Sequence, residues 1–199
     1  MEILFSDNNI AVCVKPVGLD SEKDVPNELI NALGGECYTV HRLDLNVGGV
    51  MVYARTKKSA AILSKHIQDG AMIKEYYAMV HGCPDAEGDW TDLLFKDSSK
   101  NKVFVVKRER KGVKKARLEY KRLTEGEASL VRIRLHTGRS HQIRVQLASR
   151  GFPLVGDHKY GSKDNAGAPM LWSCAITFPY KGEVIKFEST PDFAKVSEQ

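Results

Sequence analysis

Residues 41–54 read HRLDLNVGGVMVYA, a charged tetrapeptide followed by two glycines and an apolar run. The run Val50–Ala54 is rich in residues that favour strands, and the glycine pair indicates a turn in front of it. A carboxylate beside an arginine is a candidate reactive site, because the guanidinium favours the ionised acid and can also bind phosphate. A structural ion pair in a loop is the commoner use of such residues, so the residues alone leave both interpretations open.

Outward from this stretch, the hydrophobic pattern predicts several strands and few helices. Helices are expected at 24–34, where Gly34 and Gly35 stop the helix, at 57–69 and at 140–149. Strands are expected at 9–15, 50–54, 76–80, 103–106, 116–123, 129–135, 171–178 and 183–188, with 103–135 as an antiparallel meander. This order lacks strict βαβ alternation, so it predicts an α+β fold with a mixed, largely antiparallel central sheet and flanking helices.

The composition is that of a globular protein, with 199 residues, 42% hydrophobic and 28% charged. We expect a single domain over residues 1–199. No apolar run is long enough to span a bilayer, and no basic segment precedes an apolar core at the N-terminus. The four scattered cysteines form no Cys-x-x-Cys pair, which argues against a zinc ribbon. These features predict a cytoplasmic protein without a membrane partner.

Positive charge is concentrated in two segments. Residues 100–122 contain eleven Lys or Arg and two acids, and residues 131–150 contain five Arg and no acid. Together these segments carry a charge of +14. Because the net charge of the whole chain is +5, the rest of the chain carries −9. An acidic body with two basic segments favours a polyanionic partner, with nucleic acid first, although a solvated charged hairpin would show the same pattern.

Two further stretches are candidates for chemistry. Residues 135–147, LHTGRSHQIRVQL, place Arg139 and Arg144 at a strand–turn–helix junction, where a helix N-terminus could bind an anion. Residues 156–161, GDHKYG, form a turn in which a metal site from Asp157 and His158 lacks further ligands at useful spacing. Walker A, Gly-x-Gly-x-x-Gly and EF-hand patterns are missing from the sequence, which disfavours nucleotide and calcium cofactors.

The HRLD tetrapeptide followed by GGVMVYA resembles the active-site loop of the RluA family of pseudouridine synthases. Four other stretches are similar to this family in the same order, and the resemblance runs from about residue 9 to residue 193. These stretches are VKPVGL at 14–19, KEYYAMVHG at 74–82, TGRSHQIR at 137–144 and GDHKYG at 156–161. Each is weak alone, but five in order at compatible spacing are highly specific.

The resemblance implies the pseudouridine synthase fold, with the catalytic cleft across the sheet and a monomeric protein. The first family stretch begins near residue 9, so we expect a stand-alone catalytic domain without the N-terminal S4 domain of many relatives. The chain departs from the family at Val47-Gly48-Gly49, where members commonly have Thr-Ser-Gly. Both versions supply small residues, so the departure concerns the shape of the loop.

The resemblance also implies the reaction, which is the isomerisation of specific uridines in ribosomal or transfer RNA. Asp44 matches the catalytic carboxylate, acting as nucleophile at C1′ or as base at C2′. Tyr76 matches the tyrosine that stacks on the base and assists removal of the C5 proton, and Arg144 matches the arginine that pairs with the aspartate. The reaction involves neither redox change nor net transfer, so we expect no cofactor and no metal.

Other basic residues are expected to contact RNA. Arg42 would fill the space left by the flipped uridine or hold its phosphate. The remaining candidates for the pocket or the RNA backbone are His41, Lys15, Lys74, Arg139, Lys111, Lys114 and Lys115.

Two alternatives belong to other functional classes. A non-catalytic RNA-binding module would keep the basic face and leave Asp44 dispensable. A glycoside or nucleoside hydrolase would release free uracil or sugar, but it usually needs a second carboxylate. The HRLD tetrapeptide offers only one acid.

Overall fold

The computed structural model describes residues 1–195, which divide into two compact units. The first unit comprises Met1–Glu75 and Trp172–Pro191. The second comprises Tyr76–Leu171 together with the residues from Asp192 to Lys195.

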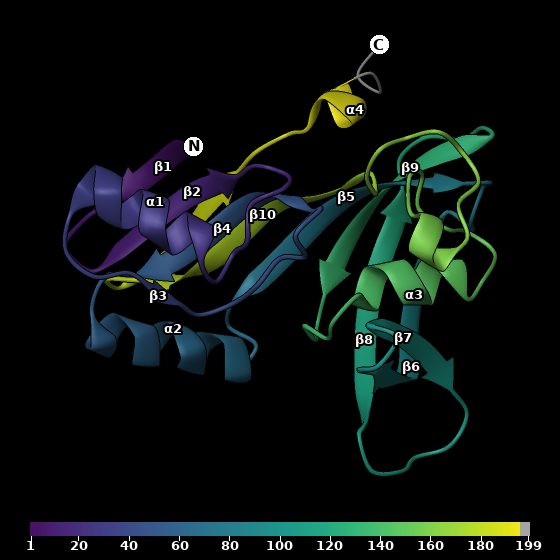
Figure 1. The fold of residues 1–199 in the computed structure, drawn as a ribbon, viewed down its shortest axis with the longest axis horizontal. Coiled ribbons are helices and arrows are strands. Elements are labelled where there is room, and N and C mark those ends of the chain that lie inside the picture. Colours follow the sequence, from purple (N-terminus) through teal and green to yellow (C-terminus); the bar gives the residue numbers. More distant parts are fainter. Residues whose placement is uncertain (196–199) are drawn as a thin grey trace. The chain divides into compact units, whose positions relative to one another are not determined.

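The first unit is built on a mixed sheet (Figure 1). Strand β4 lies between β2 and β10 and also pairs with β3, while β1 pairs with β2 and β11 with β10. The β4–β10 pair is parallel and the others named here are antiparallel. The strands are β1 (Glu2–Ser6), β2 (Ile10–Lys15), β3 (Tyr38–Thr39), β4 (Gly48–Ala54), β10 (Leu171–Tyr180) and β11 (Glu183–Glu188).

Two helices accompany this sheet. Helix α2 (Lys57–Gln68), drawn below the strands in Figure 1, packs Leu63 with Ala60 and Ile67 onto a core built from β2, β4 and β10, as its sequence pattern predicts. Thr56 caps its first turn by accepting the Ser59 N–H at 3.1 Å. Helix α1 (Asp24–Leu33) ends at Gly34, whose φ of 68° suits a residue without a side chain.

The second unit has the strand order β5, β9, β8, β6, β7. Helix α3 (Gln142–Ala148) packs against β6 and β7 and contacts the short 3₁₀ helix η1 (His158–Tyr160) (Figure 1). Their shared core contains Leu94, Val103, Ala116, Val145 and Tyr160. The strands are β5 (Ile73–His81), β6 (Glu87–Asp97), β7 (Lys102–Val106), β8 (Val113–Arg122) and β9 (Ala128–Leu135).

The predicted meander is wrong in one respect, because β7 and β8 are not neighbours. Strand β6 lies between them and pairs antiparallel with both. Its sequence, EGDWTDLLFKD, is rich in acids and poor in strand formers. Asp92 in this strand accepts hydrogen bonds from Arg150 at 2.8 and 3.2 Å and from Gln146 at 2.7 Å, so a distant ion pair compensates for the unfavourable local sequence.

The predicted α+β class and the mixed, largely antiparallel strand pairing are confirmed. A short helix, α4 (Asp192–Lys195), ends the described chain. Among residues 1–195, no helix has the length and apolar character needed to cross a bilayer.

Candidate active site

The loop that carries Asp44 is fastened to the first unit at alternate residues. The Val52 N–H donates to His41 Nε2 at 3.2 Å, and the Ser21 hydroxyl donates to the Leu43 carbonyl at 3.0 Å. The first bond holds the His41 side chain and the second holds the Leu43 backbone, so the residues on both sides of Arg42 are attached. The loop conformation is therefore set by neighbouring strands and turns as well as by its own sequence.

Lys15 makes the third attachment of this loop. Its Nζ donates to the carbonyls of Leu45 at 3.2 Å and Pro16 at 2.9 Å, and its side chain is fully buried. Burial lowers the pKa of Lys15 to about 8, while the negative charges of Asp20 and Asp44 oppose that shift. We expected Lys15 at the pocket or the RNA backbone, but its ammonium group is used inside the protein to hold the Asp44 loop.

His41 and Lys74 were also expected to contact RNA, but burial lowers the pKa of both side chains. Burial and the positive charge of Lys74 lower the pKa of His41 to about 3, so its ring is neutral at physiological pH. Burial lowers the pKa of Lys74 as well. His41 therefore braces Val52 without adding positive charge toward RNA.

Arg42 is the exposed member of the tetrapeptide. It forms an ion pair with Glu22 at 2.9 Å, and both side chains are about half exposed. Exposed pairs contribute about 0–1 kcal/mol, so an RNA phosphate could replace Glu22 at small cost.

The two glycines after the loop are required by the close approach of the neighbouring strand β10. Gly48 and Gly49 pair with Trp172 and Ser173 of β10. A Cβ on Gly48 would lie 2.3 Å from the Trp172 ring, and one on Gly49 would lie 2.2 Å from the Ser173 carbonyl oxygen. A side chain at position 48 would therefore collide with the Trp172 ring.

In the second unit, β5 directs its two adjacent tyrosines to opposite faces. Tyr76 is 5% exposed. Tyr77 lies under Arg132, whose guanidinium carbon is 5.7 Å from the ring centroid. The two side chains therefore lie on opposite faces of β5, as the alternation along a strand predicts.

Polar groups of the turn before α3 form hydrogen bonds with a side chain from the start of that helix. Gln142 Oε1 accepts the Thr137 hydroxyl at 2.8 Å and the Arg139 N–H at 3.0 Å. His141 adopts a left-handed conformation with φ of 50°. The N–H of Arg139 therefore has an internal acceptor, and the anion site considered from the sequence is not needed to explain this turn.

Arg144 of α3 is buried and held by the GDHKYG turn. Its Nε and Nη2 donate to the two carboxylate oxygens of Asp157 at 2.7 and 2.8 Å. His158 bonds through both ring nitrogens to the carbonyls of Ser162 and Ala166, and these bonds raise its pKa. Asp157 and His158 thus have other partners than a metal, and no cluster of three or more potential metal ligands occurs in the described residues.

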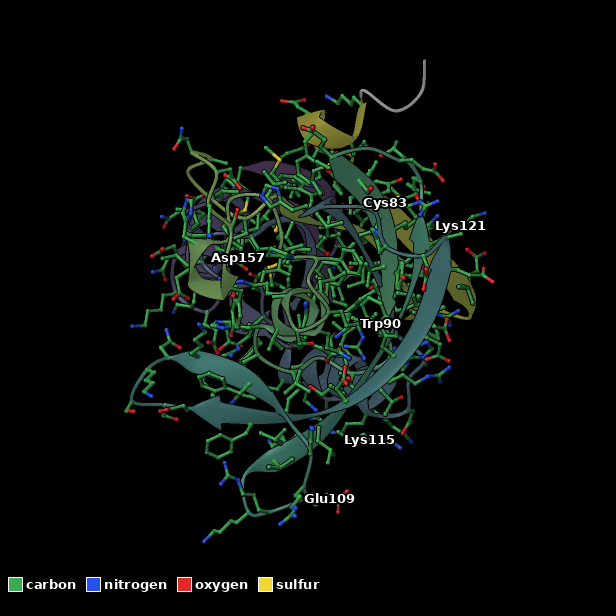
Figure 2. The ribbon with its side chains drawn as sticks, turned by 90° about the vertical axis from the view of Figure 1, so that its right-hand side faces the viewer. Cys83, Trp90, Glu109, Lys115, Lys121 and Asp157 are labelled. Carbon is green, nitrogen blue, oxygen red and sulfur yellow. The ribbon has the colours of Figure 1, made fainter. Side chains whose placement is uncertain are left out.

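Several cations of the two basic segments are held in ion pairs. Arg144 and Arg150 of the 131–150 segment bind Asp157 and Asp92, so these two cations have acids of the chain as partners. Arg117 likewise binds two acids, Asp89 and Glu119. Six exposed cations follow the loop from β7 into β8, where Figure 2 shows Glu109 at the tip and Lys115 further along the strand. They are Lys107, Arg108, Arg110, Lys111, Lys114 and Lys115.

The structure thus groups the expected residues by unit. Asp44 lies with Lys15, His41, Arg42 and Lys74 in the first unit. The second unit contains Tyr76, Arg139, Arg144, Lys111, Lys114 and Lys115. Sequence reasoning missed the roles of Ser21 and Asp157, because their partners lie 22 and 13 residues away.

Comparison with known proteins supports the same class. The family model described as RNA pseudouridylate synthase matches residues 9–149. "Ribosomal large subunit pseudouridine synthase D" of Zymomonas mobilis is 32% identical over 88% of this chain and 61% of its own length. "Dual-specificity RNA pseudouridine synthase RluA" of Escherichia coli is 32% identical over 96% of this chain and 93% of its own length.

Solved structures show the same fold. Human RNA Pseudouridylate Synthase Domain Containing 4 has a TM-score of 0.82 at 24% identity, covering 98% of this chain and 91% of that chain. Human RNA Pseudouridylate Synthase Domain Containing 1 has a TM-score of 0.84 at 20% identity, with coverages of 99% and 86%. The family match and the curated relatives, on this fold, define the class as that of the pseudouridine synthases. The chain belongs to the RNA pseudouridylate synthase family, which confirms the resemblance.

Proposed function

We propose that this protein isomerises specific uridines in ribosomal or transfer RNA to pseudouridine, with Asp44 as the catalytic carboxylate. The chain spans 61% of the length of the first Z. mobilis relative, so the activity is stated here as a proposal. The observation that carries the proposal is the Asp44 loop, fastened at His41, Leu43 and Leu45 in a chain of this family.

The reaction breaks the N1–C1′ bond of uridine and forms a C5–C1′ bond, after which C5 loses its proton and N1 gains one. Asp44 acts at C1′ as nucleophile or at C2′ as base. By the family resemblance, Arg144 pairs with Asp44 and fixes the rotamer of its carboxylate. Tyr76 stacks on the uracil and assists removal of the C5 proton.

We also propose that the protein acts as a cytoplasmic monomer without a cofactor. The four cysteines are free thiols, which is consistent with a reducing compartment. The name of the Z. mobilis relative refers to the ribosomal large subunit, which supports ribosomal RNA as a candidate substrate. Transfer RNA is the other candidate that the resemblance implies.

Mapping pseudouridines in total RNA from cells with and without this protein tests the proposal. We expect one or a few positions to lose pseudouridine in its absence and to regain it when purified protein is added. Release of free uracil would indicate a hydrolase instead. RNA binding without any modified position would indicate a non-catalytic binding module.

The Tyr76→Phe variant should bind RNA and break the glycosidic bond, yet stall before product release. Phe keeps the stacking ring in a position that is 5% exposed, while the hydroxyl proposed to assist proton removal is lost. Single-turnover assays would follow cleavage and product separately. Tyr77→Phe on the opposite face is the matched control and should react at the wild-type rate. Wild-type turnover by Tyr76→Phe would leave Tyr76 with a stacking role alone.

Changing Lys111, Lys114 and Lys115 together to Gln should weaken RNA binding and flatten its salt dependence. Each lost phosphate contact lowers the slope of log K against log salt by about 0.7–0.9, so we expect a decrease of about two. Chemistry at saturating enzyme should change little, because these side chains lie on an exposed loop and strand.

The control for this variant removes three exposed lysines of α2, Lys57, Lys58 and Lys65, and should leave the slope unchanged. Equal slopes for wild type and the Lys111, Lys114 and Lys115 variant would place the RNA elsewhere on the protein. Loss of chemistry with intact binding would mean that this segment shapes the active site.

A further inference from the structure

The turn Gly156–Gly161 is a family stretch that the proposed reaction leaves without a role. Its backbone is tightly constrained, since Gly156 has a φ of 81° and a Cβ there would lie 2.0 Å from the Ala168 carbonyl oxygen. Two side chains of the turn, Asp157 and Tyr160, contact Arg144 within the second unit.

Asp157 occupies one edge of the Arg144 guanidinium. The Nε and Nη2 bonds of 2.7 and 2.8 Å form a bidentate pair, which fixes the plane of the guanidinium. Asp157 is 1% exposed and Arg144 is 8% exposed, so water competes little for either group. This pairing uses two of the five N–H donors of a guanidinium and leaves the others to bind further acceptors.

Tyr160 covers the face of the same guanidinium. The guanidinium carbon lies 5.1 Å from the ring centroid, within cation–π range. The Tyr160 hydroxyl accepts the Val103 N–H at 2.8 Å and lies 2.9 Å from His141 Nδ1. The ring is thus held by β7 and by the residue before α3.

We propose that Asp157 and Tyr160 are positioning residues, which fix the plane and direction of the Arg144 guanidinium for its part in the reaction. This inference rests on the proposed function, because it assumes that Arg144 acts in the reaction. Rotation of Arg144 away from Asp157 would leave the buried Asp157 carboxylate without its bidentate partner, which opposes such movement.

The Asp157→Asn variant tests this role, because it keeps the size of the side chain but turns one acceptor into a donor that faces Arg144. We expect kcat to fall by roughly 30- to 100-fold, the scale of a misplaced catalytic group, with KM for RNA within about twofold of wild type. In ¹H–¹⁵N spectra, the Arg144 Nε–H signal should lose its protection from exchange with water.

Asp92→Asn is the matched control. It breaks another bidentate ion pair of the second unit, that of Asp92 with Arg150 at 2.8 and 3.2 Å, without touching Arg144. We expect a comparable loss of thermal stability with kcat unchanged. A purely structural role of Asp157 would instead lower kcat equally in both variants or in neither.

Two further variants separate position from charge. Asp157→Glu restores the charge but displaces the carboxylate, so kcat should lie between those of Asp157→Asn and wild type. In an Arg144→Lys background, Asp157→Asn should reduce kcat by less than about threefold, since the two residues act as a unit.

Wild-type kcat in Asp157→Asn, an equal loss in Asp92→Asn, or fully multiplicative losses with Arg144→Lys would overturn the inference. If the wild-type protein modifies no RNA, the proposed function fails on its own. The Nε–H signal then still decides the positioning role, and its unchanged protection in Asp157→Asn would refute that role.

Discussion

Replacing Asp44 by Asn should abolish pseudouridine formation, with a loss of more than about 10⁴-fold in kcat, as when a member of a catalytic unit is removed in other enzymes. The amide can neither attack C1′ as a carboxylate does nor accept a proton at C2′. Fold and RNA binding should be nearly intact, because the loop attachments run through its neighbours His41, Leu43 and Leu45. Release of tritium from C5-labelled uridine in RNA would measure the loss.

Asp69→Asn is a suitable control, since Asp69 is an exposed acid of the same unit at the end of α2. It should react at the wild-type rate. Mass spectrometry of freshly purified Asp44→Asn must exclude deamidation to Asp, and Asp44→Ala provides a variant that cannot revert. Appreciable turnover by either Asp44 variant would remove Asp44 from the catalytic role.

The Gly49→Ala substitution should destabilise the first unit by about 3 kcal/mol or more. Gly49 has a φ of 119°, and its Cβ would lie 2.2 and 2.5 Å from the Ser173 backbone oxygen and nitrogen. Backbone atoms of a paired strand cannot move aside as a flexible side chain can, so strands β4 and β10 must separate locally. Urea unfolding would measure the change.

Two other glycines separate the contributions to this cost. Gly70 has a φ of 72° but open space around it, so Gly70→Ala reports the backbone strain alone, about 1–2 kcal/mol. Gly167 has open space and no positive φ, so Gly167→Ala should be close to neutral. If Gly49→Ala costs no more than Gly70→Ala, the close approach of β10 is not what requires glycine at this position.

Local patterns predicted most helices and strands correctly, because their evidence lies within a few residues. Leu63 with Ala60 and Ile67 shows the helical repeat of α2, and Gly34 marks the end of α1. Strand β6 was missed for the opposite reason. Its acidic sequence gives little local sign of a strand. In the structure β6 pairs with β7 and β8, and its Asp92 binds Arg150 and Gln146, more than fifty residues away.

The candidate site divides in the same way. The sequence was sufficient to name the HRLD tetrapeptide, Tyr76 and Arg144, because motifs are recognised by residue types and their spacing along the chain. The sequence could not show that Lys15 turns inward to the Leu45 carbonyl or that Arg42 pairs with Glu22. Long, flexible cations reach many acceptors, and only the packed structure selects among them.

By itself the sequence determined the family, the α+β class and the two basic segments, and it singled out Asp44 as the acid of the proposed reaction. These follow from residue identity, short-range periodicity and the order of motifs. Only the tertiary structure decided that β6 separates β7 from β8, that Trp172 and Ser173 require glycines after the loop, and that Asp157 holds Arg144. Each of these depends on the approach of segments distant in the chain, where sterics and the burial of charge select one partner among many that the sequence allows.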